Sequence, residues 1–261
     1  MNNQDINELA EKVADLIIKC RKLVIFTGAG ISTESGIPDF RSPGGIWDRF
    51  DPDDFTIDKF LSNPESRRKQ WHIFKEGLMT DKAEPNAAHV AIAELHWLGR
   101  LDCVITQNVD NLHHKAGLPD DKVFELHGNM QWAKCLDCGR RYAFGEIKAR
   151  LDSGEEIPDC AVCGGMMKPD IVMFGEQLPY EVLQEAGRRA RTADLFIVIG
   201  STLVVYPAAY MPIYAVESGA KLVIVNLSET PMDHQAAVLI RAKAGETMAA
   251  IVGKVKEKAG M

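Results

Sequence analysis

The sequence predicts an α/β protein built on a Rossmann-like parallel sheet, with helices on both faces of the sheet. The first observation is a set of short apolar runs, at Leu23–Thr27, Cys103–Thr106, Leu195–Ile199 and Leu222–Val225. The second is that stretches with helical patterning lie between these runs. The third is that the first run ends directly in a glycine-rich turn. Strands that are apolar on both faces belong in a parallel sheet that is covered by helices.

The helices expected around this sheet follow from hydrophobic spacing. In residues 5–20 the apolar side chains recur every three or four positions, as they do in an amphipathic helix. Further helices are expected at residues 87–98, 180–191, 207–218 and 246–258. This alternation of strands and helices indicates a doubly wound plan.

Two segments interrupt the plan and predict a smaller second lobe within one catalytic domain, residues 1–261. The smaller lobe would comprise a helical and loop insertion, about 36–82, and a cysteine-bearing module, about 129–170. The larger lobe would then consist of residues of about 1–35, 83–128 and 171–261.

Composition and charge exclude several classes of protein. Hydrophobic residues make up 46% and charged residues 26% of the 261 residues, the balance of an ordinary globular protein. The sequence has no apolar run of the roughly 20 residues that a membrane span requires, and no signal region at its start, so we expect a cytoplasmic protein without membrane contact. The net charge of -7 argues against direct binding of nucleic acid.

Four cysteines carry the strongest spacing signal in the chain. The pair Cys135-x-x-Cys138 is followed after 21 residues by the pair Cys160-x-x-Cys163. Two such turns present four thiolates, which close a tetrahedral zinc site without an open position. We therefore predict one structural zinc ion, and the alternative is four free thiols.

Three further motifs could carry chemistry. Gly28-Ala-Gly30 follows a strand and could let a diphosphate approach backbone N–H groups, although Thr33 replaces the third glycine of the usual fingerprint and a plain tight turn is equally compatible. Thr106-Gln-Asn-Val-Asp110 places polar side chains at the carboxyl end of a strand, where open α/β sheets bind ligands. His127 is a candidate general base, although a single histidine is more often structural.

In combination, these motifs resemble the sirtuin family in its bacterial and archaeal form. The resemblance rests on GAGISTESGIPDFR from Gly28 to Arg41, TQNVDNLH from Thr106 to His113, LHGN from Leu126 to Asn129, the four cysteines, and Asn226-Leu-Ser228. It runs in order over nearly the whole chain. It implies an NAD-dependent protein lysine deacylase that yields nicotinamide, O-acyl-ADP-ribose and free lysine.

The resemblance also assigns site residues. The catalytic residues would be His127, as the base, and Asn108. NAD would be held by Gly28, Ala29, Gly30, Ser32, Thr33, Asp39, Phe40, Arg41, Gln107, Asn108, Val109, Asp110, Gly200, Ser201, Thr202, Asn226, Leu227 and Ser228. An acyl-lysine peptide would bind in extended form between the lobes, against Val172, Phe174, Gly175, Glu176, Leu203, Val204, Val205 and Tyr206.

The expected substrates carry acetyl or other neutral acyl groups. Family members that prefer acidic acyl groups carry a Tyr and an Arg three residues apart, and residues 70–75 contain no such pair. The alternatives are an NAD-dependent ADP-ribosyltransferase, a non-catalytic NAD-sensing module, and a zinc-ribbon nucleic-acid binder, which the acidic charge disfavours.

Overall fold

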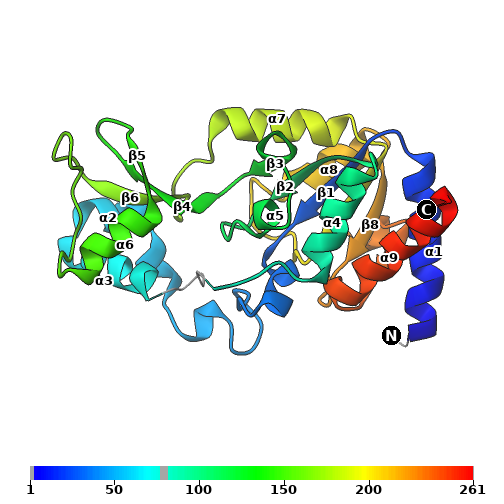
Figure 1. Ribbon diagram of the computed structural model, residues 1–261, viewed down its shortest axis with the longest axis horizontal. Helices are drawn as coiled ribbons and strands as arrows, with labels where there is room; N and C mark the ends of the chain where they lie inside the picture. The colour runs from blue at the N-terminus through cyan, green and yellow to red at the C-terminus, as the bar shows by residue number, and fades with distance from the viewer. Residues whose placement is uncertain (1–2, 77–81, 261) are drawn as a thin grey trace.

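The computed structural model describes residues 3–76 and 82–260. Its larger sheet has six parallel strands in the order β3-β2-β1-β7-β8-β9 (Figure 1). These strands are β1 (Leu23–Thr27), β2 (Leu101–Thr106), β3 (Val123–Glu125), β7 (Leu195–Ile199), β8 (Lys221–Val225) and β9 (Val238–Ile240). The winding reverses between β1 and β7, as in dinucleotide-binding sheets. The predicted fold class is confirmed.

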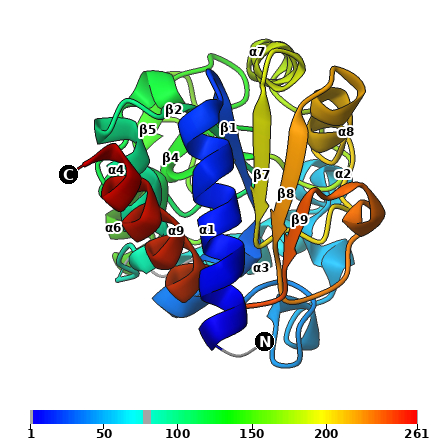
Figure 2. The same cartoon turned by 90° about the vertical axis from the view of Figure 1, so that its right-hand side faces the viewer.

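Helices cover both faces of this sheet (Figure 2). One face carries α1 (Asn3–Lys19), α4 (Ala87–Trp97) and α9 (Ala244–Ala259), and the other carries α7 (Tyr180–Arg191) and α8 (Tyr210–Glu217). Helix α1 illustrates why these helices pack against the sheet. Its buried side chains recur at helical spacing, and they are Ile6, Ala10, Val13 and Ile17. One stripe of the helix is therefore apolar, and it packs against α9 and the sheet.

The predicted boundaries agree best where the apolar pattern is longest. Strands β1 and β7 have the expected limits, whereas β3 and β9 were not predicted because each has only three residues. The helix expected at 207–218 begins only at Tyr210. Residues before it form turns instead, in which Ala209 N donates to Val205 O at 2.9 Å and Tyr210 N donates to Pro207 O at 3.1 Å.

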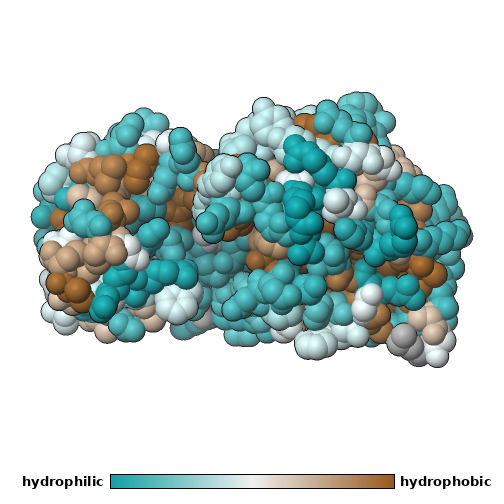
Figure 3. Space-filling model, turned by 90° about the horizontal axis from the view of Figure 1, so that it is seen from above, coloured by the Kyte–Doolittle hydropathy of each residue, from teal (hydrophilic) through white to brown (hydrophobic). Residues whose placement is uncertain are grey.

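A second group of elements packs around a three-stranded antiparallel sheet in the order β5-β4-β6. Its elements are α2 (Ile57–Ser62), α3 (Pro64–Lys75), β4 (Gly128–Cys135), β5 (Arg141–Ala143), α6 (Phe144–Asp152) and β6 (Met167–Ile171). They share a core that includes Phe60, Trp71 and Met167. In the space-filling view the molecule narrows between this group and the larger sheet (Figure 3).

The first insertion is joined by backbone hydrogen bonds to the segment that directly follows the second insertion. Phe174 N donates to Phe55 O, and Ile57 N donates to Phe174 O, both at 3.0 Å. The predicted lobe segments include residues 1–2, 77–81 and 261, which lie outside the described residues. The boundaries of the two lobes stay a prediction. Within residues 3–76 and 82–260, no helix is long and apolar enough to cross a membrane.

Candidate active site

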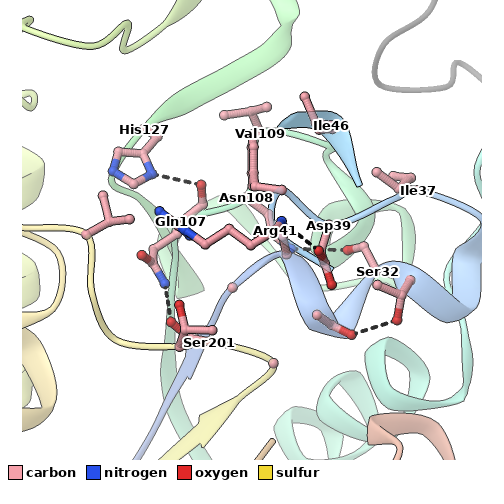
Figure 4. A pocket seen from close by; sticks show the side chains of 18 of the residues that line it. Ser32, Ile37, Asp39, Arg41, Ile46, Gln107, Asn108, Val109, His127 and Ser201 are labelled. Atoms are coloured by element: carbon pink, nitrogen blue, oxygen red, sulfur yellow. Dashed lines mark hydrogen bonds between the residues drawn. The ribbon is translucent and has the colours of Figure 1, made fainter. Parts of the chain in front are cut away.

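One cavity of about 750 Å³ opens at the carboxyl ends of β1, β2, β7 and β8 and extends to the second group of elements. All of the residues predicted to bind NAD line it, and so does His127 (Figure 4). The fold therefore brings together side chains from segments that are separated by up to two hundred positions in the sequence. The individual role of each residue stays a prediction.

Glycines form the floor of the cavity where β1 and β7 end side by side. Gly30 N donates to Gly200 O at 2.8 Å. A Cβ on Gly30 would lie 2.8 Å from Gly200 Cα, and a Cβ on Gly200 would lie 2.2 Å from Ile31 N. Gly200 also has φ +64°, a conformation that side chains disfavour. The two turns can approach this closely only because both lack side chains.

The turn after β1 differs from an ordinary Rossmann turn. The 3-10 segments η1 (Ala29–Ile31) and η2 (Thr33–Ser35) follow the strand, in place of a long helix. Thr33 Oγ1 donates to Gly30 O at 3.0 Å and so closes the turn on itself. The carboxylate of Glu34 accepts the N–H of Gly245 at 2.8 Å, at the start of α9. The structure therefore agrees with the sequence, in which Thr33 in place of the third glycine indicated a turn unlike the usual dinucleotide-binding one.

A hydrogen-bonded polar cluster lies beside this turn. Ser32 Oγ donates to Asp110 Oδ2 at 2.7 Å and accepts from Asn108 Nδ2 at 3.1 Å. Because the Asn108 amide nitrogen is engaged in this way, its oxygen is the group that can accept a hydrogen bond in the cavity. Gln107 Nε2 donates to Ser201 Oγ at 2.8 Å and links the ends of β2 and β7.

His127 is half-buried at the wall of the cavity. Its Nδ1 lies 2.9 Å from the carbonyl oxygen of Gln107. A carbonyl can only accept, so Nδ1 carries the hydrogen and Nε2 carries the lone pair of the neutral ring. Burial lowers the pKa of His127 below the ordinary value of 6.5, and the bond to Gln107 opposes this shift. His127 is therefore a neutral base at neutral pH.

Asp39 shapes the loop that follows the glycine turn. Its carboxylate accepts the N–H of Arg41 at 2.9 Å and the N–H of Ser42 at 2.7 Å. Burial acts to raise the pKa of Asp39, but the hydrogen bonds from Ser42 and Arg41 outweigh it and hold the pKa below its ordinary value. The hydrogen bonds of this carboxylate thus stabilise the conformation of its own loop at the edge of the cavity.

The predicted peptide-binding residues are only partly at the cavity. Val172, Phe174, Glu176, Val204, Val205 and Tyr206 line it. Leu203 does not line it, because it is only 2% exposed and packs into the core with residues of α8, and its role in peptide binding stays a prediction. Gly175 also lies outside the lining, in a turn with φ +82°. Glu176 is already engaged by Lys168 Nζ and Met173 N, both at 3.0 Å.

An aromatic wall of the cavity centres on Trp47, which sequence reasoning missed although it had assigned Phe40 and Phe174 to the site. Trp47 lies with its ring centroid 5.2 Å from that of Phe40, 5.8 Å from that of Phe55 and 5.7 Å from that of Phe174. Phe74, Met130 and Ile171 also line the cavity. The apolar pair Ile46-Trp47 directly after two glycines was the available signal in the sequence.

The four paired cysteines come together as predicted. Their Sγ atoms all lie within 4.8 Å of one another, with Cys135 to Cys163 at 3.5 Å and Cys138 to Cys160 at 3.7 Å. Four sulfurs at about 2.3 Å from one tetrahedral ion are about 3.8 Å apart. The geometry therefore fits one zinc ion held by four thiolates. Such a closed site stabilises the fold and leaves no position for substrate.

A parallel dinucleotide-type sheet, joined to a four-cysteine module and with a neutral histidine at their shared cavity, defines a zinc-bearing, NAD-dependent enzyme. The chain belongs to the Sir2 family, the sirtuins, whose family model matches residues 28–207. The resemblance seen in the sequence is confirmed.

Relatives of known activity match nearly end to end. NAD-dependent protein deacetylase 1 of Pyrobaculum aerophilum is 45% identical, with 94% of each chain covered. NAD-dependent protein deacylase 2 of Archaeoglobus fulgidus is 47% identical, with 94% of this chain and 95% of the relative covered.

Solved structures of the family agree with the fold. A Sir2 protein with a p53 peptide and NAD+ is 42% identical, with a TM-score of 0.84 and coverage of 95% of this chain and 98% of that one. A Sir2 variant with deacetylated p53 peptide and 3′-O-acetyl-ADP-ribose is also 42% identical, with a TM-score of 0.86 and coverage of 96% and 98%.

The glycine floor predicts the effect of a single added methyl group. Gly200→Ala should abolish NAD binding and destabilise the protein by about 2 kcal/mol or more, because the Cβ meets the backbone of the facing turn. Gly253→Ala, in an exposed turn of α9 with open space around it, is the matched control and should be neutral or stabilising by up to about 1 kcal/mol. Thermal unfolding and NAD titration of both variants provide the check, and wild-type NAD affinity in Gly200→Ala would contradict this account.

Removal of zinc should lower stability and activity together. Treatment with a chelator, or the substitution Cys138→Ser, should lower the melting temperature by several degrees, because the metal ties two turns of the antiparallel sheet. Cys20→Ser, at the end of α1, should keep one zinc per chain. Metal analysis with thermal unfolding measures both effects, and a metal-free protein with unchanged melting temperature would refute a structural role.

Proposed function

We propose that this sirtuin removes acetyl groups from lysine side chains of proteins and consumes NAD in doing so. The observation that carries the proposal is the placement of the neutral His127 ring in the same cavity as all of the predicted NAD-binding residues. The deacetylase and deacylase activities of relatives that match over the whole length support it. With one water molecule consumed, the products would be nicotinamide, O-acetyl-ADP-ribose and free lysine.

Bound NAD supplies an electrophilic ribose carbon whose leaving group is nicotinamide, and the acetyl oxygen of the substrate attacks that carbon. The chain's own residues then have two tasks. His127 Nε2 accepts the proton of a ribose hydroxyl, for which it must be neutral. The Asn108 oxygen, oriented by Ser32, accepts a hydrogen bond from a ribose hydroxyl or from water.

The aromatic wall serves the same chemistry by excluding water. Phe40 and Trp47 lie against each other at the edge of the cavity. A dry site strengthens the interactions that stabilise developing charge and prevents hydrolysis of NAD in the absence of substrate. In our proposal Phe40 covers the nicotinamide side of the cavity.

The peptide would bind as an extended strand along residues 172–174 and 204–206. The N–H groups of Val172 and Phe174 already donate to His127 O at 2.8 Å and to Phe55 O at 3.0 Å. The first of these bonds joins the backbone of His127, the proposed base, to Val172 in the proposed peptide-binding segment. Recognition through the backbone tolerates many sequences.

Cytoplasmic location stays a prediction from the sequence.

The proposal predicts an NAD-dependent loss of acetyl mass from an acetyl-lysine peptide, with one nicotinamide released per acetyl group. His127→Ala should lower the rate by at least about a hundredfold, whereas His72→Ala, on the exposed surface of α3, should retain full activity. A succinyl-lysine peptide should not react, since the cavity has no Tyr and Arg pair from residues 70–75. Nicotinamide release without loss of acetyl groups would instead identify ADP-ribosyl transfer or NAD hydrolysis.

The pH dependence of the reaction rate should also follow the ionisation of His127. The base works only when neutral, and its pKa lies below 6.5 in the folded protein. The acid limb of kcat/KM for NAD should therefore have its midpoint below 6.5, and activity should be lost as the pH falls through that midpoint. A pH profile with a stable acetyl-lysine peptide measures it. A midpoint above 6.5 would show that burial does not control this histidine.

A further inference from the structure

Two buried histidines that the proposed mechanism does not use lie behind the polar cluster of the cavity. His113, in the short helix α5 (Leu112–Lys115), is 2% exposed, and His89, in α4, is fully buried. Their ring centroids are 5.1 Å apart. Neither His113 Nδ1 nor His89 Nε2 has a hydrogen-bond partner among the described residues. Unpaired buried nitrogens are costly, so their juxtaposition calls for a physical explanation.

A chain of hydrogen bonds leads from His113 to the cavity. His113 Nε2 lies 2.9 Å from Thr27 Oγ1, and the single hydroxyl hydrogen of Thr27 is directed to Thr106 Oγ1 at 2.8 Å. Thr27 Oγ1 must therefore accept from His113, which places the hydrogen on Nε2 and the lone pair on Nδ1. Thr106 Oγ1 in turn accepts the backbone N–H of Asn108 at 3.0 Å.

His89 has the opposite arrangement of donor and acceptor. Its Nδ1 accepts the backbone N–H of Asn86 at 3.4 Å, so the hydrogen of the neutral ring is on Nε2. The Asn86 side chain donates to Ile31 O at 2.7 Å and to Ser35 Oγ at 3.0 Å, and thereby holds the turn after β1. The remaining donor is thus on His89 and the remaining acceptor is on His113, so the two rings are complementary.

Both rings are neutral at physiological pH, as these tautomers require. Burial lowers the pKa of His89 to about 4, and it also lowers the pKa of His113 well below 6.5. Neither side chain lines the cavity as far as the structure describes it. The hydrogen bonds that connect the rings to the cavity run through Asn86 on one side and through Thr27 and Thr106 on the other.

We propose that the His89–His113 pair positions the two loops of the NAD site, residues 29–35 and 106–110, relative to each other. Helices α4 and α5 each contribute one ring, and each ring is hydrogen-bonded toward one of the loops. His113 is a positioning residue that orients Asn108 without touching substrate. The inference rests on the proposed function only in taking NAD as the ligand of these loops.

Calorimetric titration with NAD tests this role without relying on catalysis. His113→Leu and the isosteric Thr27→Val should each weaken the Kd for NAD about tenfold, because each breaks the same chain of bonds. The double variant should be no more than about twofold weaker than either single variant. His113→Gln, which keeps an N–H near the position of Nε2, should restore the Kd to within about threefold of wild type, and His89→Leu should act like His113→Leu.

Partial unfolding would lower kcat but leave both the Kd for NAD and the KM for the acetyl-lysine peptide unchanged. A weaker Kd for NAD with an unchanged peptide KM therefore identifies the positioning role. Independent, multiplying effects in the double variant, or a Gln variant as weak as the Leu variant, would overturn the proposal. If His113→Leu does not fold, the Kd for NAD of Thr27→Val, of Thr106→Val and of their double variant tests the same chain of hydrogen bonds. Failure of the wild-type protein to bind NAD would instead refute the proposed function.

Discussion

The close approach of two glycine turns, after β1 and after β7, is the constraint on which the rest of the site depends. The turns face each other across the point where the sheet reverses its winding, and the Gly30 to Gly200 hydrogen bond joins them. Because neither turn carries side chains there, the floor of the cavity is backbone. The Gln107 to Ser201 bond adds a second connection, from the end of β2 to the turn after β7. The polar cluster around Ser32 takes its position from these contacts.

The sequence was sufficient to predict those features that depend on local pattern. Runs such as Leu23–Thr27 are apolar at all but the last position, and a strand covered on both faces buries every side chain. The cysteine pairs were equally readable, because two turns of fixed spacing present four thiolates whatever surrounds them. Strands β3 and β9 have too few residues to show a pattern, and the start of α8 depends on turns around Pro207.

The remaining features of the site depend on contacts between distant segments. Leu203 looks in sequence like its exposed neighbours, but a backbone with φ +57° turns it into the core. The tautomer of His127 is determined by a carbonyl twenty positions earlier in the chain. The ring of Trp47 packs against those of Phe55 and Phe174, whose segments are joined by a backbone hydrogen bond. Periodicity and spacing contain no information on such pairings.

The Glu34 carboxylate at the start of α9 limits which groups are left to hold the diphosphate of NAD. The positive end of a helix is the usual partner of a dinucleotide's diphosphate, but here the turn after β1 is a pair of 3-10 segments and the N-terminus of α9 is already neutralised by Glu34. The diphosphate is then left to backbone N–H groups of a short turn. Such a site suits a reactant that departs, chemically altered, in every catalytic cycle, rather than a redox cofactor that a dehydrogenase recycles.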